Sequence, residues 1–301
     1  MPSMSHPLIL VLPDLTLLLA PPVNYIFAGI LGAVIGSFLN VVIHRLPLEE
    51  SIVFPNSKCP SCEAVIAFYD NVPVLSYVLL GGRCRACKEQ ISPRYPSVEL
   101  LTALLFIAVA WRDGITPALA FDLVFVSALV ALIFIDAEHM ILPNAITYPG
   151  IAFAIVARLA LPYLMGQPHF DDLPWLMDGA LKGWPLWAAS LGGAFLGALI
   201  GGGSLWLMGW TWEKLRGIEA MGLGDVKMMF MVGAYLGWRL TIVTIFLSVL
   251  SGSVIGVLLM MRQGRKDLQM LLPFGVFLGI GSIIALLTGV HLVEWYAGQF
   301  R

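Results

Sequence analysis

The chain has 301 residues, of which 59% are hydrophobic and 12% are charged, and its mean hydropathy is +0.87. Soluble domains contain roughly half apolar and about a quarter charged residues, so this composition excludes an ordinary soluble protein and indicates a membrane protein. The formal net charge of -2 at pH 7 also argues against a nucleic-acid partner, because nucleic-acid-binding domains carry a clear basic excess.

Eight apolar segments are candidates for membrane spans, because about 20 mostly apolar residues cross a hydrocarbon core of roughly 30 Å. The second and sixth are short unless neighbouring residues extend them. The sequence therefore predicts an all-helical, polytopic membrane protein with about eight transmembrane helices. The segments are residues 23 to 44, 97 to 112, 118 to 135, 146 to 164, 185 to 209, 224 to 237, 240 to 261 and 273 to 291. The earlier apolar run 8 to 20 has no basic flank, which argues against a cleavable signal, and it is expected in the membrane interface.

Glycines at helical spacing occur in two of these segments. Gly29, Gly32 and Gly36 lie in the first segment, and Gly193 and Gly197, followed by a glycine at 201, lie in the fifth. Small residues at this spacing are typical of close helix packing in membranes.

Lysine and arginine predict the orientation, because short cytoplasmic loops keep an excess of both. Twelve of the 17 fall on one side if the loop after the first segment is cytoplasmic, and both termini then lie outside. The cytoplasmic set is Arg45, Lys58, Arg83, Arg85, Lys88, Arg94, Lys214, Arg216, Lys227, Arg262, Arg265 and Lys266, and the outer set is Arg112, Arg158, Lys182, Arg239 and Arg301.

Residues 46 to 96 form the one stretch long enough for a soluble subdomain, and it interrupts the first two segments. We therefore expect three parts. Residues 1 to 45 hold the outer N-terminus and the first transmembrane helix, residues 46 to 96 form a cytoplasmic metal-binding domain, and residues 97 to 301 form the main membrane domain.

All four cysteines lie in the insert as two CxxC pairs, with 21 residues between the pairs. That spacing lets two loops bring four thiolates around one tetrahedral ion. A disulfide framework or a redox pair is the alternative, but the reducing cytosol disfavours it. The pattern favours zinc in a structural role, because four thiolates leave no coordination position for water. The expected ligands are Cys59, Cys62, Cys84 and Cys87.

Two carboxylates stand out because each lies at the predicted cytoplasmic end of an apolar segment. Asp136 directly follows the apolar run 132 to 135, and Asp225 follows Gly222-Leu223-Gly224. A carboxylate inside the bilayer costs roughly 2.5–3.5 kcal/mol on insertion scales, so such groups usually mark a functional site or a specific partner. Taken singly, Asp225 is explained equally well as an early-turn acid that stabilises its helix, and Asp136 as a satisfied helix-end residue.

The two acids at matching depth favour an aspartic-peptidase pair. Carboxylates that share a proton have pKa values that split, so one acts as general base on water while the other protonates the carbonyl oxygen. Other acids and bases are weaker candidates. Glu99 is interpreted as a helix-start acid rather than part of a polar cavity. Lys227 either modulates Asp225 electrostatically or extends its charged end to the membrane interface. Asp122 is expected to pair with another residue or to face a polar gap near the outer side.

Two other classes of function remain open at this point. A proton-coupled transporter would use the same carboxylates, but it requires polar residues strung across the membrane, and the predicted segments have few at mid-depth. A non-catalytic scaffold would use the cysteine-rich insert to dock a partner. The Gly222-Leu223-Gly224 run is not a dinucleotide fingerprint, because Lys227 replaces the third glycine and no strand precedes it.

Taken together, the motifs resemble those of the bacterial prepilin peptidases, also called type IV leader peptidases, over nearly the whole chain. The resemblance rests on the run Gly36 to Pro47, the two CxxC pairs around Tyr69 to Tyr77, the run Arg94 to Leu100, Asp136 with Leu142-Pro143, the run Gly222 to Lys227, and Pro273-Phe274-Gly275. The chain departs from the family pattern at Asn144, where aspartate is frequent, and at Val276, where proline is frequent.

The resemblance implies an enzyme of the bacterial cytoplasmic membrane with catalytic Asp136 and Asp225 near the cytoplasmic face, and with Gly222, Gly224 and Lys227 in support. Its expected partners are prepilin and pseudopilin substrates and the lipid bilayer. Many family members also methylate the new N-terminal amine with S-adenosylmethionine, an activity that the resemblance ties to the insert and to Gly82 and Glu99. The sequence predicts no oligomeric state.

Overall fold

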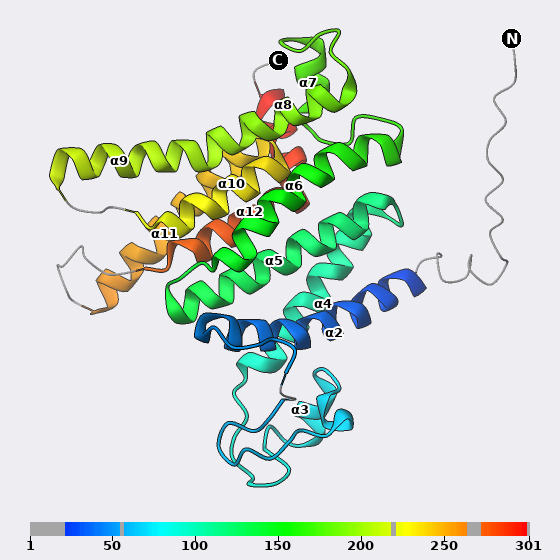
Figure 1. Ribbon diagram of the computed structural model, residues 1–301, viewed down its shortest axis with the longest axis vertical. Helices are drawn as coiled ribbons and strands as arrows, with labels where there is room; N and C mark the ends of the chain where they lie inside the picture. The colour runs from blue at the N-terminus through cyan, green and yellow to red at the C-terminus, as the bar shows by residue number, and fades with distance from the viewer. Residues whose placement is uncertain (1–21, 55–56, 218–220, 264–271, 300–301) are drawn as a thin grey trace, which may run out of the picture.

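The computed structural model describes residues 22–54, 57–217, 221–263 and 272–299 (Figure 1). The apolar run 8 to 20, together with Arg265, Lys266 and Arg301 of the orientation argument, lies outside these ranges. Within them the chain is helical and contains two isolated antiparallel bridges but no strand.

A helix occupies each of the eight predicted segments. The helices are α2 (Val23–Arg45), α4 (Arg94–Asp113), α5 (Pro117–His139), α6 (Asn144–Met165), α8 (Leu186–Ala198) with its continuation, α10 (Leu223–Leu236), α11 (Trp238–Gln263) and α12 (Phe274–Gly298). The π-helical turn η3 (Leu199–Gly203) joins α8 to α9 (Ser204–Arg216), so the fifth span continues beyond its predicted end at 209. Within the described residues seven helices are long and apolar enough to cross a membrane.

The sixth predicted span, α10, is the exception in length. Its 14 residues extend only about 21 Å, short of a hydrocarbon core of roughly 30 Å. The bundle has two ends. The helices α2, α5, α9 and α11 all end at one of them, which we call the insert end, and the opposite one is called the distal end. The insert between α2 and α4 contains η1 (Leu46–Leu48), η2 (Phe68–Asn71) and α3 (Leu75–Leu79), and the distal loop before α8 contains α7 (Leu173–Asp178).

Proline and glycine set many of the helix ends. Pro117 occupies the first turn of α5, and Pro143 and Pro273 directly precede α6 and α12, positions where the missing N–H of proline costs nothing. Gly217 ends α9 with a φ of 66°, and Gly237 turns α10 into α11 with a φ of 83°, a conformation that L side chains rarely adopt.

The short helix α10 is the most enclosed of the bundle, and it lies among α6, α8, η3, α11 and α12 (Figure 1). Glycines allow this close packing. A Cβ at Gly201 would lie 2.5 Å from the Met229 carbonyl oxygen, and Gly197 and Gly233 each place their backbone in the space that a Cβ on the other would need. Similar contacts at Gly32 and Gly36 bring α2 against α4, which confirms the predicted glycine-mediated packing.

A buried polar cluster joins four helices near the distal end. The Tyr235 hydroxyl of α10 donates to Asp122 of α5 at 2.6 Å, and Arg112 of α4 bonds the other oxygen of Asp122 at 2.5 Å. Arg112 also donates to the carbonyl of Leu286 in α12. The Tyr235 ring stacks on Phe125 at 4.1 Å. Asp122 is therefore paired, as the sequence predicted.

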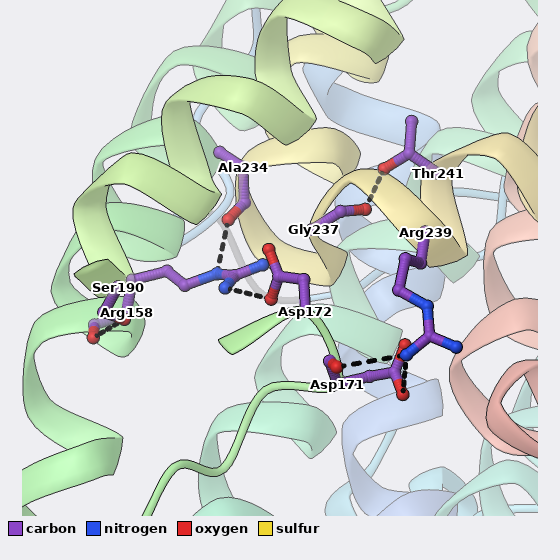
Figure 2. A network of polar contacts seen from close by, with 8 residues as sticks. All are labelled: Arg158, Asp171, Asp172, Ser190, Ala234, Gly237, Arg239 and Thr241. Atoms are coloured by element: carbon purple, nitrogen blue, oxygen red, sulfur yellow. Dashed lines mark hydrogen bonds and ion pairs between the residues drawn. The ribbon is translucent and has the colours of Figure 1, made fainter. Parts of the chain in front are cut away.

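A second cluster fixes the distal end of α10 from the other side (Figure 2). Arg158 of α6 is fully buried, bonds Asp172 at 2.7 Å and donates from Nε to the Ala234 carbonyl of α10 at 3.0 Å. The Ser190 hydroxyl of α8 donates to the Arg158 carbonyl at 2.5 Å. Burial of this ion pair is costly unless its hydrogen bonds are made, so the cluster holds α6, α8 and α10 in one arrangement.

Replacing Arg158 tests this cluster. Arg158→Met should cost about 3–5 kcal/mol, because it leaves Asp172 buried without its counter-charge. The double variant Arg158→Met/Asp172→Leu should recover part of the loss. The matched control is Arg239→Met, whose partner Asp171 is more exposed than Asp172, and it should cost less than Arg158→Met. Thermal unfolding in one detergent gives the comparison, and equal midpoints for the two single variants would contradict it.

Candidate functional site

Asp136 lies in the last turn of α5 and faces the start of α12. Its side chain is buried, and its Oδ2 accepts a hydrogen bond from the Val276 N–H at 3.0 Å. The Gly275 N–H donates to the same carboxylate. The first N–H groups of a helix have no partner inside the helix, so the start of α12 is a natural binding site for a carboxylate.

Asp225 lies in the first turn of α10, where Gly222 is the N-cap residue and accepts the Asp225 N–H at 3.2 Å. The carboxylate is partly buried, and it makes no capping hydrogen bond within the described part of the chain. Asp225 is the acid of the first turn of α10, the position that the early-turn explanation requires, and its charge there is favourable without a capping hydrogen bond.

The two carboxylates come together although 88 residues separate them in the sequence. Asp136 is close enough to repel the charge of Asp225 directly. Leu142 lies between their helices: a Cβ at Gly224 would be 3.0 Å from the Leu142 Cβ, and a Cβ at Gly275 would be 3.1 Å from its Cδ1 and 2.8 Å from Asp136 Oδ2. Gly224 and Gly275 thus leave the room in which the pair sits.

The surroundings of the two acids are unequal. Two N–H groups of α12 hold Asp136, whereas Asp225 has no such donors among the described residues. Two nearby carboxylates in different environments divide one proton unevenly, and this arrangement supports acid and base roles in the same step.

The structure shows contacts of Lys227 that neither of the two predicted alternatives included. Its Nζ donates to Asn144 Oδ1 at 2.8 Å and lies 5.3 Å from the centre of the Tyr148 ring. The contact ties α10 to the start of α6. The hydrogen bond uses the asparagine that departs from the family pattern. Gly222 has looser surroundings than Gly224, since a Cβ there would meet Asp225 only at 3.7 Å.

The cysteines form two equivalent loops. In each loop the N–H of a residue after the second cysteine, Glu63 or Lys88, donates to the carbonyl of the first cysteine, and both residues have positive φ. Isolated bridges close the loops, Lys58 with Val65 and Arg83 with Gln90. One conformation of the CxxC motif therefore occurs twice.

The four sulfur atoms of Cys59, Cys62, Cys84 and Cys87 lie within 4.8 Å of one another, and the thiols form no disulfide. Sulfurs around a tetrahedral zinc ion with bonds of about 2.3 Å are roughly 3.8 Å apart, and the Sγ atoms of Cys59 and Cys87 are 3.9 Å apart. The N–H groups of Cys87 and Ala86 lower the pKa of the Cys84 thiol to about 7, which favours the thiolate form that binds metal. The donor set fits a metal ion.

A cavity of about 710 Å³ lies between the insert and the insert-end turns of α2 and α4. Glu99 lines it and is buried, and its carboxylate accepts the Val74 N–H at 2.7 Å. Glu99 is the sixth residue of α4, so its interpretation as a helix-start acid was wrong. A residue beyond the first turn is too far from the free N–H groups to cap them.

Gly82 lies behind this cavity. Its φ is 67°, and a Cβ there would be 3.0 Å from the hydroxyl of Tyr77, which lines the cavity. Any side chain at this position would strain the backbone and displace Tyr77.

Two family models match the sequence. Residues 30–113 match the bacterial peptidase A24 N-terminal domain, and residues 123–257 match the type IV leader peptidase family. The chain is 36% identical over 309 residues to a prepilin leader peptidase/N-methyltransferase of Pseudomonas aeruginosa, covering 95% of this chain and 98% of that protein. The chain belongs to the type IV leader peptidase family.

Other relatives agree with this assignment. A protein of the same name from Aeromonas hydrophila is 37% identical, with 88% of this chain and 91% of that protein covered. A Myxococcus xanthus relative of that name is 41% identical over 81% of this chain, but the match covers only 65% of that longer protein. No solved structure matches the chain.

Roles of several residues in and near the candidate site were not predicted. The N–H groups of Gly275 and Val276 bind Asp136, although Pro273-Phe274-Gly275 was recognisable in the sequence only as a motif. Arg94 of α4 forms an ion pair with Glu138, two residues after Asp136. Asn40 of α2 is buried and donates to the Tyr95 carbonyl at 3.0 Å. A single asparagine in an apolar segment is the signal that could have found it.

Metal analysis tests the cysteine cluster. The purified protein should contain about one metal ion per chain, because four thiolates complete one tetrahedral site. Cys84→Ser should lose the ion and make the insert sensitive to protease, since a structural metal contributes directly to folding. Ser61→Ala, between two of the ligands, is the control and should keep the ion. Full metal content in Cys84→Ser would contradict the prediction.

Proposed function

We propose that this protein is a membrane aspartic endopeptidase that removes the basic leader from type IV prepilins and from pseudopilins of type II secretion, and that it then methylates the new N-terminal amine. The observation that carries the peptidase proposal is the placement of Asp136 and Asp225 near each other in unequal surroundings. The names of the relatives support both activities.

In the proposed mechanism a water molecule lies between the two carboxylates and the scissile carbonyl. One carboxylate removes a proton from the water while the other protonates the carbonyl oxygen, so no covalent intermediate forms. Gly224 and Gly275 keep the space above the pair free of side chains. Leu142 and Lys227 fix the relative position of α6 and α10 around the pair.

The insert end is the cytoplasmic end in this proposal, in a bacterial cytoplasmic membrane. The excess of lysine and arginine at this end supports the orientation. A substrate helix enters sideways from the lipid and presents its cytoplasmic end to Asp136 and Asp225. The division into residues 1 to 45, 46 to 96 and 97 to 301 remains part of the same proposal.

Two bound groups belong to the proposal. The four cysteines hold a structural zinc ion, which stabilises an insert too small for a large apolar core. S-adenosylmethionine supplies the methyl group, because methylation of an amine requires an electrophilic methyl donor.

A proton-coupled transporter receives no support from the described residues. The buried hydroxyls of Thr241, Thr244 and Ser282 donate to carbonyls one turn earlier in their own helices. Between Asp122 and Asp136, the side of α5 that faces the core is apolar. The described part of the chain thus presents no polar path that connects the two ends of the membrane domain.

Mass spectrometry of a co-expressed prepilin tests the function. The wild type should yield a substrate that lacks its leader and carries one added methyl group. Asp136→Asn and Asp225→Asn should each reduce cleavage at least about 100-fold, because each variant removes one acid–base group. Asp178→Asn, an exposed acid of the distal loop, should cleave like the wild type. Normal processing by Asp136→Asn would refute the mechanism.

A further inference from the structure

An apolar groove of about 790 Å³ lies between α9, together with the turn η3, and α11. Both helices contact α10, and Figure 1 shows them spread apart at the insert end. Of the seven long apolar helices in the described chain, α11 is the least buried, so the groove faces the lipid and not the core. We call it the α9–α11 groove, and its lining includes Gly203, Ser204, Leu207, Phe246, Val249 and Ser253.

The side of the groove formed by η3 and α9 reaches the depth of Asp225. Gly197 packs on Gly233 of α10, and one turn closer to the insert end Gly201 packs on the Met229 carbonyl. The two helices are thus antiparallel and in register, and one further turn places Asp225 level with the first turn of α9. Only about 6 Å along α10 separate Asp225 from the contact at Met229.

The side formed by α11 reaches the depth of Asp136. Gly252 of α11 packs on Phe277 of α12. Two residues before Phe277, the Gly275 N–H donates to Asp136. Ser253 lines the groove and is next to Gly252, so it lies level with Asp136. Both sides of the groove therefore reach the depth of the acid pair.

The Ser253 hydroxyl in the groove is available to a ligand. Thr244, Ser248 and Ser251 of the same helix each donate to a carbonyl four residues earlier, whereas the Ser253 hydroxyl has no hydrogen bond within the described part of the chain. The end of a helix leaves backbone groups without partners inside the helix. A substrate helix that ends beside Ser253 offers such groups, and the acyl chain of a lipid offers none.

The length of the groove and its small residues suit a helix. Between residues 199 and 207 the α9 side extends about 12 Å, which matches about two turns of a second helix. Gly203 and Ser204 in this wall let another backbone approach closely, and membrane helices associate through such small residues. No charged residue lines the groove within the described ranges, so an apolar helix meets no unpaired charge there.

We infer that the α9–α11 groove binds the apolar helix of the substrate and holds its cytoplasmic end beside Asp225 and Asp136. The inference rests on the proposed peptidase function, to which it adds the path by which the substrate helix leaves the lipid. The backbone that follows the docked helix has to cross about one helix width, roughly 10 Å, to reach the acid pair, and about three extended residues span that distance.

Photo-cross-linking of the full-length protein to a co-expressed prepilin tests the groove. With p-benzoylphenylalanine in place of Phe246, ultraviolet light should join the protein to the apolar helix of prepilin. The matched control carries the same photoreactive residue in place of Phe38, an exposed phenylalanine of α2, which packs on α4 and α5, and it should give no prepilin product. The Asp136→Asn variant should keep the Phe246 product, because docking of the helix does not require cleavage.

Cleavage kinetics with purified prepilin give a second test. Ser253→Trp fills the insert end of the groove and should raise KM about tenfold while kcat changes less than about twofold, which is the pattern of lost substrate binding. Val254→Trp is the matched control, because Val254 is exposed on the same helix but does not line the groove, and it should cleave like the wild type.

The outcomes separate this inference from the proposed function. A wild type that cleaves prepilin while the Phe246 position labels only lipid, or only a second copy of this protein, would overturn the groove and leave the proposed function in place. Labelling of prepilin from Phe38 instead of Phe246, or equal KM values for Ser253→Trp and Val254→Trp, would overturn the groove as well. A wild type that does not cleave prepilin, although the Phe246 position labels its helix, would overturn the proposed peptidase and leave the groove as a docking surface.

Discussion

The distal attachment of α10 is the constraint on which the rest of the membrane domain depends. This helix is too short to cross the bilayer, so contacts inside the bundle must set its depth. Tyr235 bonds Asp122 of α5, and Arg158 of α6 bonds the carbonyl of Ala234. Ten residues, or about 15 Å of helix, then separate Tyr235 from Asp225. The distal bonds therefore determine how far Asp225 reaches toward the insert end.

The helix α5 is the second central element, because it carries a residue of each of three polar sites. At the distal end Asp122 bonds side chains of α4 and α10. Near the insert end Asp136 accepts hydrogen bonds from the first N–H groups of α12, and Glu138 forms an ion pair with Arg94 beside the cavity. Under the proposed function, hydrolysis takes place at the last turn of α5.

The sequence predicted most of the elements because apolar length and the positions of proline and glycine are local properties. It placed all eight helices and the two CxxC loops, and it put Asp136 and Asp225 at the same end. The closeness of the two acids could not be predicted from one sequence, since it depends on how α5, α10 and α12 pack. The error on Glu99 has the same origin, because the residue's role follows from the insert folding back over α4 and not from its place in the helix.

The hydrogen bonds to Asp136 show a further limit of prediction from the sequence. Pro273-Phe274-Gly275 was recognisable as a motif, but only the packing of α12 against α5 turns its N–H groups toward a carboxylate. Lys227 is similar, because its partner Asn144 lies 83 residues away in the sequence. The motifs of a site in this bundle are short runs that can be recognised in the sequence. The residues that contact each other in the site are far apart in the sequence, so their pairing cannot be read from it.

The most direct test of the central claim is a structure of the protein with a prepilin-like peptide in which a hydroxyl-bearing tetrahedral carbon replaces the scissile carbonyl. Such a group resembles the hydrated carbonyl and should bind tightly to a true acid pair. We expect the hydroxyl to lie within hydrogen-bonding distance of both Asp136 and Asp225, with the Gly275 and Val276 N–H groups still on Asp136. A hydroxyl that contacts only one of the two acids, or that binds elsewhere, would contradict the proposed acid pair.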